Sequence, residues 1–183
     1  MNDALLLKWS WRFKKEGNSL WKNIIVSCHG SSRPWAMLPC SASASGCWKQ
    51  IVKVGEQKLP NGELLNSYFV ASLGDGSSLN FWGDLWLGDT PLRVRYPNLF
   101  NLERDKWVKV SGRVHFEYNV NTLRWNWKRE PSSYQELTEL FSLLGEIYDV
   151  NRQGDSDVWK WKASTDGIFS VSRLESSCLI TFQ

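Results

Sequence analysis

Tryptophans that alternate with basic residues are the feature of this sequence best suited to binding a ligand. Of its 183 residues, 12 are tryptophan. Nucleic-acid-binding proteins stack bases on aromatic rings and hold phosphates with arginine and lysine. We expect two groups of residues to contact RNA or single-stranded DNA: Trp9, Trp11, Arg12, Lys14, Lys15 and Lys22, and then Arg124, Lys128 and Arg129, which lie beside Trp125 and Trp127. Indole rings also build hydrophobic cores, so burial is the alternative for most of the twelve.

Three carboxylates near tryptophans suggest a second kind of chemistry. Asp75, Asp84 and Asp89 lie close in sequence to Trp82 and Trp86, and glycosidases use two carboxyl groups at a set separation. Aspartate also accepts hydrogen bonds in turns, and the glycines in this stretch indicate turns. We favour the structural interpretation of these aspartates.

Thiols and imidazoles do not form a recognisable site in the sequence. Cys28, His29, Cys40 and Cys47 offer zinc-ligand atoms, but the gaps between the cysteines are longer than the two to four residues typical of a structural zinc site. The other histidine, His115, lies in no motif of a catalytic triad. We therefore expect free thiols, no metal and no cofactor.

Apolar spacing predicts helices in the first third of the chain and again near its end. Helices are expected over residues 3–15, from about Ser19 to a stop at Gly30, and from Trp48 to a stop before Pro60. The clearest amphipathic pattern covers residues 137–148. It is preceded by serines with capping-box spacing, Ser132 before Gln135 and Ser133 before Glu136.

Alternating patterns predict two β-hairpins. One would pair residues 68–73 with 78–82 across the turn 74–77, and the other would pair 158–162 with 168–171 across Asp166-Gly167. The fold class is therefore α+β, with an N-terminal helical arm and then short antiparallel hairpins packed with one amphipathic helix. We expect a helical arm over 1–38, a flexible Ser/Ala linker over 39–47, and an α+β connector region over 48–183 whose C-terminal end is altered or truncated.

The charge is unevenly distributed, although the chain as a whole carries only +3. Residues 1–60 hold nine basic and three acidic side chains, an asymmetry that favours a polyanionic partner. The sequence shows neither a secretion signal nor a transmembrane stretch, so we expect an intracellular protein of the nucleus or cytoplasm with no membrane contact.

The order of landmarks along the chain resembles a known family. The landmarks are Trp9-Ser10-Trp11-Arg12-Phe13, Trp48-Lys49-Gln50-Ile51, Gly74-Asp75-Gly76, Phe81-Trp82-Gly83-Asp84-Leu85-Trp86, Tyr96-Pro97-Asn98-Leu99-Phe100, Trp125-Asn126-Trp127, Asp157-Val158-Trp159-Lys160-Trp161 and Gly167-Ile168-Phe169-Ser170-Val171. This set is similar to the segment of plant LINE-type (non-LTR) retrotransposon reverse-transcriptase polyproteins between the polymerase domain and the reverse-transcriptase zinc-binding domain. The resemblance implies an ancestral role in supporting template RNA or target DNA beside the polymerase.

The chemistry that flanks this segment in the family is not found in the sequence. The family's polymerase uses an aspartate pair, and this chain has no Asp-Asp; ribonuclease H and endonuclease motifs are absent as well. The family's zinc ligands would follow Val171, where only 12 residues remain, so Cys178 is not assigned as a ligand. The resemblance thus implies a fragment that is not an enzyme and retains non-specific RNA or DNA binding.

Two alternatives stay open at the level of sequence. A tryptophan-rich carbohydrate-binding or protein-interaction module would have its indoles exposed on one β face. A decayed remnant without a selected function is the other alternative. The oligomeric state is not set by the sequence.

Overall fold

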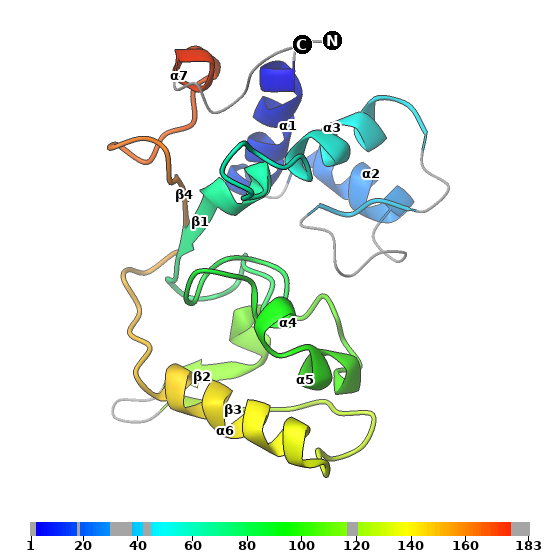
Figure 1. Ribbon diagram of the computed structural model, residues 1–183, viewed down its shortest axis with the longest axis vertical. Helices are drawn as coiled ribbons and strands as arrows, with labels where there is room; N and C mark the ends of the chain where they lie inside the picture. Colours follow the sequence, from blue (N-terminus) through cyan, green and yellow to red (C-terminus); the bar gives the residue numbers. More distant parts are fainter. Residues whose placement is uncertain (1–2, 18, 30–37, 42–44, 117–120, 177–183) are drawn as a thin grey trace. The chain divides into compact units, whose positions relative to one another are not determined.

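The computed structural model describes residues 3–17, 19–29, 38–41, 45–116 and 121–176 (Figure 1). The fold is α+β, as predicted: helices combine with two small two-stranded sheets. The chain forms two compact units, unit 1 from Met1–Val70 with Trp159–Gln183, and unit 2 from Ala71–Val158. The arm, linker and connector boundaries expected from the sequence differ from this division and stay a prediction.

Unit 1 is built around its first helix. Helix α1 (Asp3–Lys15) packs against α3 (Cys47–Gly55) and α7 (Val171–Ser176), while α2 (Leu20–His29) follows α1 directly in the chain. The three helices predicted in the first third are thereby confirmed. The predicted stop at Gly30, residues 42–44 of the linker, and Cys178 lie outside the described residues. Within the described ranges, no helix has both the length and the apolar character that crossing a membrane requires.

Aromatic rings form the core of unit 1. The ring of Trp11 stacks on Phe69 with the centroids 5.7 Å apart, and Phe69 lies 5.1 Å from Trp161. The rings of Trp161 and Phe169 are perpendicular, with their centroids 5.1 Å apart. Each such pair contributes roughly 0.5–1.5 kcal/mol beyond the area that it buries. These contacts join α1 to segments more than 140 residues later in the chain.

The two predicted hairpins are not formed as expected. Strand β1 (Phe69–Ser72) pairs with β4 (Val158–Trp161), so its partner is distant in sequence and is not the segment 78–82. In the second predicted hairpin, β4 forms and Gly167 makes the turn with a φ of +68°, but residues 168–171 are not a strand. The alternation along β4 is as predicted: Trp159 and Trp161 are buried and Lys160 is exposed.

The glycine-rich segment after β1 is held by a carboxylate instead of closing a hairpin. The peptide N–H groups of Gly74, Gly76 and Ser78 all donate to the carboxylate of Asp157 at 2.9 Å, and the Ser78 hydroxyl does so as well. A Cβ at Gly74 would overlap the backbone of Ser156, so only glycine allows this close approach. The segment 74–78 therefore curls around Asp157.

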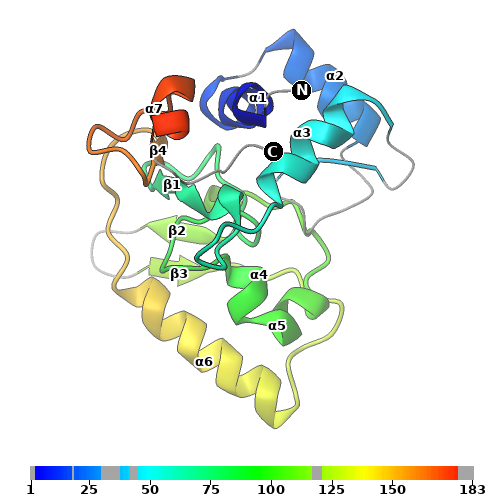
Figure 2. The same ribbon diagram turned by 45° about the horizontal axis from the view of Figure 1, so that its top comes forward.

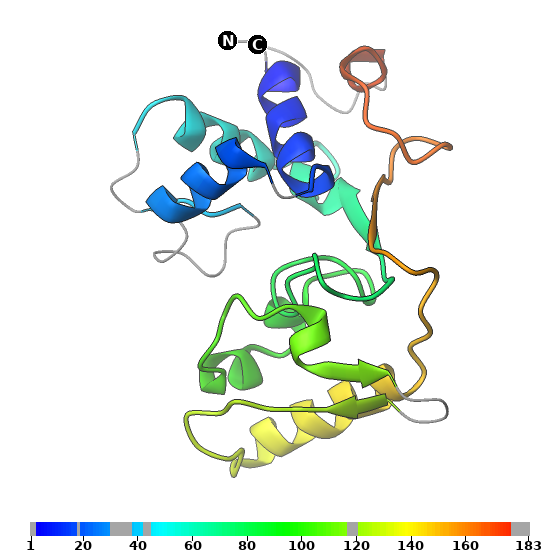
Figure 3. The ribbon, with the colours of Figure 1, turned by 180° about the vertical axis from the view of Figure 1, so that it is seen from behind.

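Unit 2 combines short helices with a small antiparallel sheet and one long helix. Helices α4 (Leu92–Arg95) and α5 (Pro97–Leu102) precede strands β2 (Val114–Phe116) and β3 (Asn121–Leu123), which place Val114 opposite Leu123. Helix α6 (Tyr134–Tyr148) lies beside β3 and α5 (Figures 2 and 3). The predicted capping box is confirmed, because Ser133 and Glu136 exchange hydrogen bonds at the start of α6.

A buried ion pair lies in the middle of unit 2. The Glu103 carboxylate is 0 % exposed and accepts two hydrogen bonds from Arg113, at 2.9 and 2.8 Å. It also accepts from the Trp82 indole N–H and from the peptide N–H of Asp105. Both oxygens of the buried carboxylate are therefore satisfied, as a buried charge requires.

Replacing Arg113 should destabilise unit 2 strongly. Arg113→Ala leaves the Glu103 charge buried without its partner, and we expect the free energy of unfolding to fall by about 3–5 kcal/mol. Urea unfolding followed by tryptophan fluorescence measures this change. Arg124→Ala, which removes an exposed arginine of the same unit, should change stability by no more than about 0.5 kcal/mol. Equal effects of the two variants would contradict the assignment.

Asp157 should make stability depend on acid pH. Burial raises the pKa of Asp157, but the hydrogen bonds from Ser78, Gly74 and Gly76 outweigh it and hold the pKa below its usual 3.8. A lowered folded-state pKa gives a stabilisation that is present above about pH 4 and is lost as the pH falls through the folded value. Asp157→Asn should therefore be less stable than the wild type at pH 6, and the difference should shrink toward pH 2. A constant difference across this range, measured by urea unfolding, would contradict the assignment.

Candidate nucleic-acid interface

Helix α1 has a buried side and an outer side, and the sequence-predicted residues are divided between them. Trp11 is 6 % exposed and packs on Phe69, whereas Trp9 is 41 % exposed. Residues two positions apart on a helix lie about 200° apart around its axis, so the two indoles are on opposite sides of α1. The outer side carries Lys8, Trp9, Arg12 and Lys15 at helical spacing.

An ordered cation–aromatic cluster lies on this outer side. The guanidinium of Arg12 lies 4.5 Å from the centre of the Trp9 ring and 5.8 Å from that of Trp21. Glu16 accepts hydrogen bonds from Arg12 and from the Trp21 indole N–H, and these two bonds lower the pKa of Glu16. Glu16 therefore stays ionised and fixes the orientation of Arg12 over Trp9.

The lysines of the first group also lie along aromatic rings. The ammonium nitrogen of Lys14 is 5.0 Å from the Trp159 ring centre, and that of Lys15 is 5.8 Å from Trp11. Lys22 donates to the backbone oxygen of Glu16 at 2.7 Å and lies 5.1 Å from the Phe13 ring. Long basic side chains commonly cover apolar surface with their stems while the charged end stays near water. The whole first group lies in unit 1, but Trp11 and Lys14 contact buried rings while Trp9 and Arg12 lie on the outer side of α1.

The second group lies in unit 2, and most of its charge has a protein partner. Arg129 donates to both carboxylate oxygens of Glu136, and this pair, with the peptide N–H groups of Ser132 and Ser133, lowers the pKa of Glu136 to about 2. Lys128 donates to the backbone oxygen of Asn101 at 2.9 Å. Arg124 is exposed. Arg129 and Lys128 therefore hold secondary structure in place.

Two basic residues that the sequence analysis did not single out, Lys8 and Lys106, lie near these two groups. Lys8 lies on the outer side of α1 next to Trp9, and its spacing of four from Arg12 is the signal that could have found it. Lys106 in unit 2 lies with its ammonium nitrogen 4.0 Å from the centre of the Phe100 ring. Burial, with the nearby charge of Lys128, lowers the pKa of Lys106 to about 8. No local sequence pattern predicts the half-buried position of Lys106.

Two of the three carboxylates near tryptophan, those of Asp84 and Asp75, accept hydrogen bonds in turns, as predicted. Asp84 is 4 % exposed and accepts from the peptide N–H of Asn80 at 2.7 Å, while Asp75 accepts from Ser77. Trp82 is fully buried. Among the described residues, no three or more His, Cys, Asp or Glu side chains gather where they could hold a metal ion. The described thiols are Cys40, which is buried, and Cys28 and Cys47, which are exposed.

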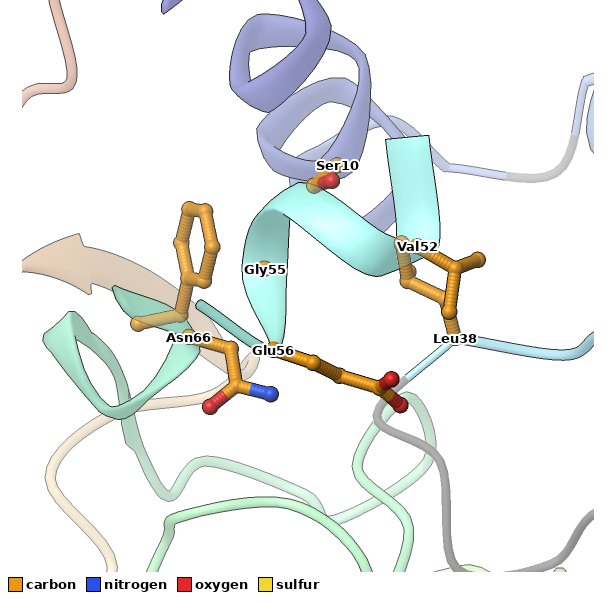
Figure 4. Close-up of a pocket in the computed structure, with 7 residues that line it drawn as sticks. Ser10, Leu38, Val52, Gly55, Glu56 and Asn66 are labelled. Atoms are coloured by element: carbon orange, nitrogen blue, oxygen red, sulfur yellow. The ribbon is translucent and has the colours of Figure 1, made fainter. Parts of the chain in front are cut away.

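A small hollow lies between α1, α3 and the 3₁₀ turn Leu65–Tyr68 of unit 1 (Figure 4). Ser10, Val52, Gly55 and Asn66 are among its lining residues. Its volume of about 10 Å³ is about that of one water molecule. The hollow is too small for a sugar, a nucleotide or any organic cofactor.

The pKa of Lys106 should respond to its neighbour. Lys128→Gln removes a like charge, so the pKa of Lys106 should rise above about 8 yet stay below the usual 10.5, because burial of the ammonium group is unchanged. An NMR titration that follows the Lys106 side-chain carbon next to the nitrogen measures the shift. Arg124→Gln, which removes an exposed charge from the same unit, should leave the pKa unchanged. Identical titration curves for the wild type and Lys128→Gln would refute the coupling.

One comparison with known proteins gives a similar chain. A protein of Arabidopsis thaliana described as "Putative ribonuclease H protein" is 29 % identical over 184 aligned residues, which cover 93 % of this chain and 26 % of that protein. This chain therefore spans about a quarter of the relative's length. No protein-family model matches the chain, and no solved structure matches it.

This relative corrects one expectation drawn from the sequence. The chain was expected not to be an enzyme, because the polymerase, ribonuclease H and endonuclease motifs were not found in it. The Arabidopsis protein carries the name of an enzyme family and is similar over nearly the whole of this chain. The absence of known motifs from the sequence is therefore no ground for excluding enzymatic activity.

Proposed function

We propose that unit 1 binds single-stranded RNA or DNA, as a nucleic-acid-holding segment derived from a plant retrotransposon polyprotein of the LINE type. The observation that carries the proposal is the charge of unit 1. This unit holds twelve basic and six acidic side chains, a net charge of +6, whereas unit 2 holds ten basic and thirteen acidic side chains. A positive surface of this size attracts polyanions from solution.

The outer side of α1 supplies the contacts that such a strand needs. Lys8 and Lys15 present positive charge along the helix, Arg12 lies between them in an ion pair with Glu16, and Trp9 has 41 % of its surface exposed. Phosphates would lie against the basic side chains while a base stacks on the indole. Trp11 is excluded from this role in the proposal because Phe69 covers it.

The similarity to a ribonuclease H protein supports the same class of ligand. The name of the Arabidopsis relative is that of an enzyme that acts on RNA, and a protein that processes a strand needs surfaces that hold it. The family resemblance of the landmark motifs implies the same partner. Strand β4 does not offer the exposed indoles of a carbohydrate-binding face, since Trp159 and Trp161 are both buried.

Binding of a labelled oligouridine by the full chain, followed by fluorescence anisotropy, tests the proposal. The logarithm of the binding constant should fall linearly with the logarithm of the salt concentration. Lys8→Ala should make this slope shallower by about 0.7, the value for one phosphate contact on a single strand. Trp9→Ala should weaken binding by roughly 5- to 150-fold, since a stacked base contributes about 1–3 kcal/mol. Trp9→Phe should retain most of the affinity.

A matched control separates a contact from the general field of the unit. Lys53→Ala on α3 removes the same charge from unit 1 at another exposed position, and it should leave the slope unchanged. Equal effects of Lys8→Ala and Lys53→Ala on the slope would contradict the assignment of the binding site to α1. No binding at low salt would overturn the proposal itself.

A further inference from the structure

Helix α6 has a second apolar side that the described residues of unit 2 leave exposed. Its inner side buries Leu143 and Ile147. Its outer side exposes Tyr134 by 82 %, Phe141 by 69 % and Tyr148 by 62 %, with Leu137 and Leu144 each exposed by 38 %. Figure 2 shows α6 along the edge of unit 2. A contiguous apolar stripe of this kind marks an interaction surface.

The spacing of the stripe is that of a helix pair. Its members follow one another at intervals of three, four, three and four residues, which is the a/d repeat of a coiled coil. The order of residue types, Tyr-Leu-Phe-Leu-Tyr, also reads the same in both directions. An antiparallel two-fold pair would therefore bring Tyr134 against the partner's Tyr148, leucine against leucine, and Phe141 against its own copy on the axis.

The charge distribution of α6 favours a second copy over a charged partner. All three acidic side chains of the helix are directed to partners within unit 2: Glu136 to Arg129, Glu139 to Asn98, and Glu146 to Arg95. The residues between the members of the stripe on its exposed side are Gln135, Thr138, Ser142 and Gly145. Two such neutral surfaces meet without like-charge repulsion, and neither offers an ion pair to another protein.

The size of the stripe is near that of a specific interface. Three aromatic side chains, each able to bury about 150–250 Å², and two leucines together offer on the order of 600 Å² on each copy. A standard interface buries about 800 Å² per partner. The site where a Cβ would stand at Gly145 has no other atom within 4 Å, so a second helix can approach closely at this point.

We propose that the protein forms an antiparallel two-fold dimer through the outer side of α6, with Phe141 on the axis. This assembly is independent of nucleic-acid binding by unit 1, because its residues all lie in unit 2. The dimer gives the protein two copies of unit 1.

Sedimentation of the full chain over a roughly hundredfold range of concentration tests the dimer. The wild type should approach twice the mass of one chain, and Phe141→Glu should sediment as one chain at every concentration. Val94→Glu, which adds the same charge at another exposed apolar position of unit 2, 57 % exposed, should leave the dimer intact. Far-UV circular dichroism of each variant shows that the helices are retained.

A charge pair tests the antiparallel orientation. Tyr134→Glu and Tyr148→Lys should each weaken self-association at least tenfold, and the double variant should restore it, because position 134 of one copy lies against position 148 of the other. Three outcomes would overturn the proposal: a wild type that stays monomeric, a dimer that survives Phe141→Glu, or a double variant as weak as the single ones. A monomer whose α6 becomes protected from hydrogen exchange only with another protein present would assign the stripe to that occupant instead.

Discussion

The carboxylate of Glu103 has no contact with water, so every hydrogen bond that it accepts must come from within unit 2. Arg113 supplies two of these bonds, and Trp82 and the backbone of Asp105 supply the others. Residues Glu103 and Trp127 also form a β-bridge. Because one charge requires all these groups at fixed positions, it specifies where the short segments of unit 2 lie, in a region with little regular secondary structure to do so.

Local signals in the sequence were sufficient where the partners are close in the chain. The start of α6 was predictable because Ser133 and Glu136 lie within one turn, and the alternation in β4 was predictable because it is a property of four residues. The partner of β1 was not predictable, because it lies almost 90 residues later. The glycines at 74 and 76 indicated a turn, but their hydrogen bonds to Asp157 are long-range.

The candidate interface was predictable in composition and less so in geometry. The interleaving of tryptophan with basic residues marked the segment of α1 as a candidate, yet it could not tell that Trp9 is exposed while Trp11 is buried. The charge of Arg129 was visible in the sequence, whereas its use in capping α6 was not. Lys106 had no local signal, since its surroundings come from Phe100 and Lys128. Burial and pairing are properties of the fold, and only the fold identifies which charges are available.

The order of synthesis has a consequence for the discontinuous unit. Unit 2 is one continuous stretch, while unit 1 consists of two stretches that unit 2 separates. On the ribosome, Trp11 and Phe69 are made long before Trp161 and Phe169, with which they pack. All residues of unit 2 have been translated by Val158, before Trp161 and Phe169 are made. The nascent chain thus carries an uncovered aromatic surface until residues 161–169 have been made, and such a surface is what chaperones bind.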